Sequence, residues 1–152
     1  MSDEVRTISV PAVVAELETL RQFFAATAKQ LGADQSSSTD LLVALNEAAT
    51  NIIVHGYKGR SGTIELLICS QGADLKLQLR DWAPLFDPTT VPPPQIDLPL
   101  EQRAPGGMGV HLTRHFSDDM LYRVTPDGGN ELTLVKRGVL AAPKEYHGGD
   151  DG

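Results

Sequence analysis

The 152-residue chain contains one cysteine and has no cluster of positive charge. The single Cys69 excludes an intrachain disulfide framework, and its place in an apolar run predicts a small buried residue. The net charge is −7, and Lys and Arg are nowhere concentrated. Neutralising a nucleic-acid backbone requires clustered cations, so we expect no direct nucleic-acid partner.

The chain also lacks long apolar runs and any metal-ligand spacing. No apolar run approaches the roughly 20 residues that span a bilayer, and the N-terminus shows no signal-peptide pattern. We therefore expect a soluble, cytoplasmic protein without membrane contact. The four histidines share no zinc-type spacing with Cys or carboxylates. With 41% hydrophobic and 22% charged residues, the chain is expected to form one domain with its own core.

The most informative stretch is DLLVALNEAATNIIVHGYKG, from Asp40 to Gly59. Its apolar residues recur at three- and four-residue steps, which predicts a helix with one buried face. Several candidate N-caps lie between Ser36 and Asp40, and Gly56 or Gly59 is the expected stop.

A polar stripe runs along a second face of this predicted helix. Glu47, Asn51 and His55 are spaced four residues apart. Such a stripe is often only a solvated face. However, no Lys or Arg occurs between Lys29 and Lys58, whereas solvated faces usually mix both signs of charge. A carboxylate with an amide one turn later could hold a metal-bound phosphate and accept a proton.

The segments before and after this helix predict further elements. Val5 to Val10 reads as a strand, and Pro11 fits the first turn of a helix that Gly32 closes. Thr63 to Ser70 is apolar on both phases and predicts an interior strand. The next strand, 75–80, alternates leucines with polar residues.

Asp81 continues the phase of those leucines, which places a carboxylate at the end of an inward row. An inward carboxylate needs hydrogen-bond donors to offset its desolvation. Two readings remain open: a structural aspartate bonded to backbone N–H groups of the following turn, or an acceptor for a ligand's amino group.

Residues 84–105 contain seven of the ten prolines, so neither a helix nor a central strand is expected there. A segment of this length without regular structure is usually a lid or a binding loop. It leads into three glycines and an apolar helical pattern at 110–116. Such glycines either turn the chain or bind an anion at the helix start. A closing hairpin is expected over 120–136, and 138–152 is expected to be a poorly ordered tail.

Four blocks together resemble the GHKL ATPase superfamily, and within it the single-domain anti-sigma-factor serine/threonine-protein kinases. The blocks are NEAATNIIVHGY, DWAPLFDP, APGGMGVHL and NELTLVKR, in the same order as in that group. The resemblance covers about residues 5–137. It implies an α/β (α+β) two-layer sandwich with a mixed, mostly antiparallel sheet, helices on one face and a mobile lid over bound ATP.

The resemblance also implies roles for individual residues. Asn51 would hold Mg²⁺ that bridges the ATP phosphates. Asp81 would accept a hydrogen bond from the adenine amino group, with Thr133 assisting from the last strand. Glu47 would be the general base that takes the proton of an attacking serine hydroxyl.

The glycine loop and the lid complete the implied site. Gly106, Gly107 and Gly109 would wrap the phosphates, and Arg103 lies where a lid cation could reach the terminal phosphate. One departure is Ala83, which stands where the family block reads D-x-G. If that glycine serves a positive φ, alanine would be strained.

The function implied is an ATP-dependent protein serine kinase that phosphorylates an anti-sigma-factor antagonist, a small STAS-type domain, and sequesters a sigma factor. A homodimer is also implied. The alternative is a nucleotide-gated protein-binding module without significant kinase activity. A sensor histidine kinase is less expected because the chain has no room for a phosphoacceptor helix pair. Walker A and protein-kinase signatures are absent from the sequence.

Overall fold

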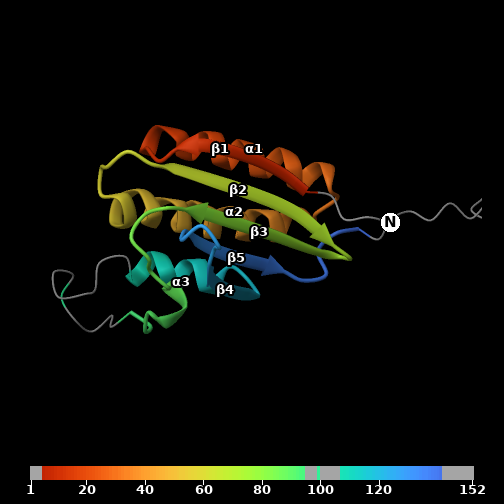
Figure 1. Cartoon of the computed structure of the whole chain (residues 1–152). Helices are drawn as coiled ribbons and strands as arrows, with labels where there is room; N and C mark the ends of the chain where they lie inside the picture. Colours follow the sequence, from red (N-terminus) through yellow and green to blue (C-terminus); the bar gives the residue numbers. More distant parts are fainter. Residues whose placement is uncertain (1–4, 95–98, 100–106, 142–152) are drawn as a thin grey trace, which may run out of the picture.

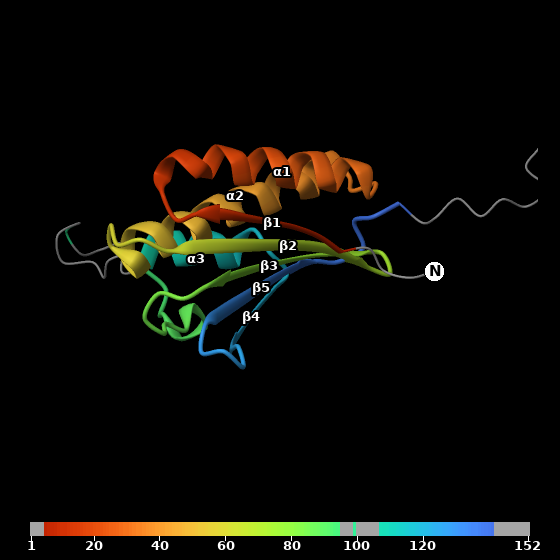
Figure 2. The same ribbon diagram turned by 45° about the horizontal axis from the view of Figure 1, so that its top comes forward.

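The structure, a computed structural model, describes residues 5–94, 99 and 107–141. A five-stranded sheet forms one layer, and the helices cover one of its faces (Figures 1 and 2). The elements in chain order are β1 (Val5–Pro11), η1 (Val14–Glu16), α1 (Leu17–Gln30), α2 (Gln35–Asn51), η2 (Ile52–Tyr57), β2 (Thr63–Gln71), β3 (Asp74–Asp81), η3 (Pro88–Thr90), α3 (Gly107–His115), β4 (Asp119–Val124) and β5 (Asn130–Lys136). The predicted two-layer sandwich is confirmed.

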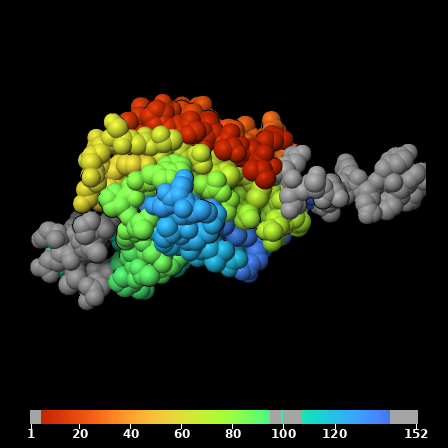
Figure 3. All heavy atoms as spheres, viewed as in Figure 1, coloured from red at the N-terminus to blue at the C-terminus, as the bar shows by residue number. Residues whose placement is uncertain are grey.

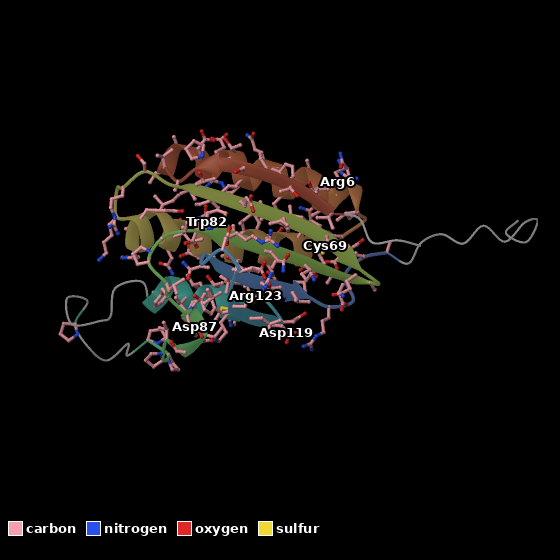
Figure 4. The ribbon with its side chains drawn as sticks, viewed as in Figure 1. Arg6, Cys69, Trp82, Asp87, Asp119 and Arg123 are labelled. Atoms are coloured by element: carbon pink, nitrogen blue, oxygen red, sulfur yellow. The ribbon has the colours of Figure 1, made fainter. Side chains whose placement is uncertain are left out.

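The strand order is β1-β2-β3-β5-β4, and each of the four pairings is antiparallel. Over the described residues the sheet is therefore antiparallel throughout, not mixed as expected. β2 lies between β1 and β3, which agrees with its apolar residues on both phases. Cys69 lies on this strand and is half-buried rather than buried (Figure 4).

The core lies between the sheet and the helices. Every second residue of β3 faces it, and Leu75, Leu77 and Leu79 are fully buried. From the helical layer, Phe24 of α1 and Leu45 of α2 are fully buried as well. Each such side chain contributes about 1.5–3 kcal/mol relative to an exposed position. The core therefore fixes α2 over the strands that carry the site.

Two predicted helix starts are wrong. Pro11 is the last residue of β1, and α1 follows only after the short η1 turn. α2 begins at Gln35, ahead of the expected caps, because Asp34 is the N-cap. Asp34 has extended backbone angles, and its Oδ1 accepts a hydrogen bond from the Ser37 N–H at 2.8 Å. That bond lowers the pKa of the Asp34 carboxyl.

The C-terminal end of α2 widens into the π-turn η2. The Lys58 N–H closes this turn by donating to the Ile53 carbonyl at 3.1 Å, five residues back. Lys58 itself is left-handed at φ 53°, the only positive φ outside glycine in the described part of the chain. The helix thus stops between the two expected glycines.

The chain remains packed beyond β5, contrary to the expected tail boundary. Val139 and Leu140 are buried. Their N–H groups donate to the Ala73 carbonyl, and Leu140 forms a bridge with Ala33. Residues 142–152 of the expected tail lie outside the described part of the chain. None of the described helices is both long and apolar enough to cross a membrane.

Candidate functional site

A cavity of about 340 Å³ lies beside the end of α2. Its walls come from α2 and η2, from α3, from the turn after β3 and from the start of β5. Of the residues predicted for a site, Asn51 and Asp81 both line it, although thirty positions separate them in the sequence. The volume lies within the range usual for small-molecule sites.

Asp81 is the carboxylate of this cavity, and it is buried at 5% exposure. Its Oδ1 accepts hydrogen bonds from the Ala83 N–H at 3.0 Å and from Asn130 Nδ2 at 2.9 Å. Burial raises the pKa of Asp81, while these two bonds act in the opposite direction. No described residue bonds Oδ2. The structural reading of Asp81 is therefore correct for one oxygen, and the other can accept from a ligand.

Asn130, at the start of β5, organises the turn beyond Asp81. Besides bonding Asp81, its Nδ2 donates to the Ala83 carbonyl at 3.2 Å. Its Oδ1 accepts from the Phe86 N–H at 3.0 Å and from the Tyr122 hydroxyl at 2.6 Å. Asn130 lines the cavity, although no sequence motif gave it a role.

Ala83 occupies its place without backbone strain. Its φ is not among the positive values, so the torsion that a glycine would serve is not used here. The methyl group packs closely instead: a Cβ added at Gly56 would lie 3.1 Å from Ala83 Cβ. The predicted weakness of the D-x-G block is thus absent from the backbone.

Glu47 and Asn51 converge on the first turn of α3. A Cβ added at Gly109 would lie 3.3 Å from Glu47 Oε1 and 3.2 Å from Asn51 Oδ1. Glycine is therefore what lets α3 approach these two side chains. Neither Glu47 nor Asn51 makes a side-chain hydrogen bond or ion pair with another described residue, so both polar groups are available to a ligand.

Cations from the loop after η2 border the same cavity. Lys58 and Arg60 both line it, and neither forms an ion pair with a carboxylate of the described residues. Arg60 is fixed by the Tyr57 carbonyl, which accepts from its backbone N–H at 3.0 Å and from its Nε at 3.1 Å. Both cations follow the helix that carries the polar stripe, so the stripe did not predict them.

The first part of the expected lid is anchored to the domain. Asp87 Oδ1 accepts from the Thr89 N–H at 2.9 Å and starts the η3 turn. Nη2 of Arg114, in α3, donates to the carbonyls of Pro88, Thr89 and Val91 at 3.3–3.4 Å. In the space-filling view the segment that follows β3 lies beside the β4–β5 hairpin (Figure 3). Hydrogen bonds with Asn130 and Arg114 thus fix the first residues of the expected lid, 86–91.

The structure does not bring Thr133 to the cavity, which corrects its predicted role. Its hydroxyl accepts from Gln78 Nε2 at 3.2 Å, on the face of the sheet away from the helices. Leu132, one residue earlier, has the opposite phase and lines the cavity. Gly107 and Gly109 lie in the first turn of α3. Arg103 and Gly106 lie outside the described residues.

The open face of the sheet carries an ion-pair cluster around one buried carboxylate instead. Glu131 is 2% exposed and bonds Arg80 Nε at 2.7 Å and Arg123 Nε at 2.6 Å. Burial alone raises the pKa of Glu131, but the two arginines outweigh it and hold that pKa below its usual range. Arg123 lies over the strands in Figure 4. This cluster is structural and separate from the cavity. The described residues contain no group of three or more metal-ligating side chains.

Comparison with protein families gives one match over most of the chain. Residues 10–136 match the histidine kinase-like ATPase domain. Among curated proteins, the serine/threonine-protein kinase BtrW of Bordetella bronchiseptica is 33% identical over 96 residues, which cover 62% of this chain and 67% of that protein. The serine-protein kinase RsbW of Bacillus mycoides is 26% identical over 133 residues, covering 85% of this chain and 82% of that protein.

Among solved structures, the chain is similar to the RsbU and RsbW domains of a Mycobacterium tuberculosis protein. The TM-score is 0.63 at 19% identity, and the match covers 91% of this chain. It covers 34% of the longer chain. At this identity the likeness supports the fold alone.

Proposed function

Because the chain belongs to the histidine kinase-like ATPase family, we propose that it binds Mg·ATP in this cavity and transfers the terminal phosphoryl group to a serine of a partner protein. One observation carries the proposal: Asn51 and Asp81 line one cavity, while Glu47 and Asn51 meet at Gly109 beside it. This arrangement supports a site in which Asp81 would accept from the adenine, Asn51 would bind Mg²⁺ at the phosphates and Glu47 would act as the base.

At the adenine end, Asp81 Oδ2 would accept a hydrogen bond from the amino group. The ring would lie against the apolar wall that Ile52, Val110 and Leu132 contribute to the cavity. Oδ1 is already held by Ala83 and Asn130, so the carboxylate is oriented before the ligand arrives. A charge-assisted bond of this kind contributes roughly 1.5–3 kcal/mol.

At the phosphate end, Asn51 Oδ1 is a hard oxygen ligand of the kind Mg²⁺ prefers. The fit is supported by the contact at Gly109, where a Cβ would fill the space between Asn51 and α3. Bound Mg²⁺ would neutralise charge on the phosphate oxygens. The α3 N-terminus, with Gly107 and Gly109, would contribute backbone N–H groups and the positive end of the helix dipole. We also propose that Gly106 and Arg103, outside the described residues, contact the phosphates.

In the transfer step, the serine Oγ forms a bond to the γ-phosphorus while the bond to the bridging oxygen of ADP breaks. Glu47 takes the hydroxyl proton, and ADP leaves. The carboxylate suits this task because no described cation pairs with it. Phosphoryl transfer depends mostly on position and charge stabilisation, so the rigid placement of Glu47 on α2 is the main contribution of the fold.

We propose an anti-sigma factor as the biological setting. The acceptor would be a small STAS-type antagonist, and the sequestered partner would be a sigma factor bound by a homodimer of this chain. The support is the resemblance of the four sequence blocks together with relatives named as serine-protein kinases.

Calorimetric titration with Mg·ATP tests the binding site. Asn51→Ala and Asp81→Asn should each weaken ATP binding at least tenfold, since each removes a charge-assisted contact worth roughly 1.5–3 kcal/mol. Asp119→Asn, an aspartate on β4 away from the cavity, is the matched control and should bind as wild type does. If wild type binds no ATP at millimolar concentration, the proposal fails.

Phosphorylation of a STAS-type domain from the same organism tests the kinase step. Glu47→Gln should retain ATP binding and lose phosphoserine formation by roughly 10²–10⁴-fold, the usual contribution of a general base. Equal rates for Glu47→Gln and wild type would remove Glu47 from this role. ATP binding without any phosphoserine would favour the nucleotide-gated binding module.

A further inference from the structure

The hydroxyl of Tyr57 lies between two strands at the edge of the site. It accepts a hydrogen bond from the Trp82 N–H at 2.8 Å and donates to the Thr63 carbonyl at 2.8 Å. Tyr57 is the last residue of the π-turn η2 and is 5% exposed. Its side chain does not line the cavity in the part of the chain that the structure describes. It therefore acts on the site through its neighbours.

This hydroxyl occupies the next position of the β2–β3 ladder. The register pairs Ile64 with Asp81, so a further step would pair Thr63 with Trp82. There the phenol oxygen stands between the Trp82 N–H and the Thr63 carbonyl. β3 ends at Asp81. The phenol thus satisfies two backbone groups at the point where the chain leaves the sheet (Trp82 is labelled in Figure 4).

The turn that the Tyr57 hydroxyl holds, at Trp82, also orients the Asp81 carboxylate. Directly after Trp82, the Ala83 N–H donates to Asp81 Oδ1. A displaced Trp82 would shift Ala83 and rotate the carboxylate, because the two N–H donors belong to consecutive residues. The Tyr57 carbonyl meanwhile holds Arg60 at the cavity wall. Tyr57 therefore connects η2 both to the turn at Asp81 and to Arg60 at the cavity wall.

The phenol ring lies directly against Gly62. A Cβ added at Gly62 would lie 2.1 Å from Tyr57 Cε1 and 2.3 Å from Cζ. A side chain at position 62 would therefore displace the ring, and glycine leaves room for it. Gly62 does not line the cavity, so substitution there acts on the site only through Tyr57.

We propose that the Tyr57 hydroxyl is a positioning group for recognition of the nucleotide base: it fixes the turn that aims Asp81 Oδ2 at an exocyclic amino group. The inference rests on the proposed ATP binding and adds a determinant of base selectivity. A change in base selectivity would distinguish this role from a purely structural one, since a structural defect would weaken the binding of all nucleotides alike.

The test compares Mg·ATP with Mg·ITP, whose base carries a carbonyl in place of the amino group. Wild type should prefer ATP at least tenfold. Tyr57→Phe keeps the ring and deletes the hydroxyl, so ATP affinity should fall about three- to tenfold, the range of one neutral hydrogen bond. ITP affinity should stay unchanged, and the ATP/ITP ratio should fall by the same factor.

Gly62→Ala provides a second route to the same effect, because its methyl group displaces the ring. It should lower the ATP/ITP ratio as Tyr57→Phe does, and it decides the question if Tyr57→Phe does not fold. Thr39→Ala, which deletes a hydroxyl bonded within α2, is the control and should leave the ratio at its wild-type value. An unchanged ratio in both test variants overturns this inference alone. Failure of wild type to bind ATP overturns the proposed function and the inference together.

Discussion

Asp81 combines a buried charge with hydrogen bonds that an uncharged side chain could also accept. Burial raises its pKa above the ordinary value of 3.8, so the folded state holds the proton more tightly than the unfolded chain. The free energy of unfolding therefore falls as pH rises from the unfolded pKa through the folded pKa. At neutral pH the full cost of the buried carboxylate is present.

Asp81→Asn should therefore leave the protein at least as stable as wild type at neutral pH, although it weakens ATP binding. The Asn oxygen can still accept from Ala83 and Asn130, and no charge is desolvated. Urea midpoints at pH 7 and pH 4 measure the effect, and the difference between variant and wild type should shrink at the lower pH. A variant less stable than wild type by more than about 1 kcal/mol at pH 7 would contradict this account.

Single residues show what the sequence could reveal about the site. Asp81 was found from its phase, because it continues the inward row of Leu77 and Leu79. The same argument selects Asn130, which shares the phase of Leu132, and excludes Thr133. Thr133 was instead predicted from the family resemblance, although its phase places it on the other face of the sheet. A residue's face on a strand was thus the better predictor.

At the scale of elements, α3 depends on Gly109 to approach α2. Gly109→Ala should improve the intrinsic helix propensity, by up to about 1 kcal/mol. Its Cβ would however lie 3.2–3.3 Å from Asn51 Oδ1 and Glu47 Oε1, so both side chains must shift by a few tenths of an ångström. We expect phosphoserine formation to fall roughly tenfold or more, since a small misplacement of catalytic groups is costly.

Thermal unfolding and the phosphorylation assay together check this prediction. The control is Met108→Ala, because Met108 is the exposed residue directly before Gly109 in α3; this variant should retain activity. A Gly109→Ala protein that is fully active would show that α3 and α2 tolerate a wider separation. Lost activity with an unchanged melting temperature would agree with a local displacement at the site.

Helices and strands were predictable where one local signal dominated. The alternating leucines of β3 and the three- and four-residue steps of α2 gave the correct elements. The start of α2 was missed because Asp34 bonds the Ser37 N–H ahead of the serine run. The π-turn η2 was not predictable, since it depends on contacts distant in sequence. Its Tyr57 hydroxyl bonds Thr63, the first residue of β2, and Trp82, the residue after β3.

At the scale of the whole molecule, the sheet joins the site to the rest of the domain. The cavity lies at the end of β3 where Asp81 is, while Ala73, just before β3 begins, receives the segment after β5. That segment also bonds the α1–α2 connection: the Asp34 N–H donates to the Val139 carbonyl and the Ala141 N–H to the Gly32 carbonyl. Residues 139–141 therefore hold the helical layer to the sheet at the end of β3 opposite the cavity.

Two truncations test this closure. A chain ending at Arg137 loses the buried Val139 and Leu140 with their backbone bonds, whereas one ending at Ala141 keeps them. Burying two aliphatic side chains contributes about 3–6 kcal/mol, so the shorter chain should be less stable by roughly that amount. The chain ending at Ala141 should have the same free energy of unfolding in urea as the full chain. Both should retain ATP selectivity while folded, because no residue of this segment lines the cavity. Equal stability of the two truncations would mean that this segment does not hold the layers together.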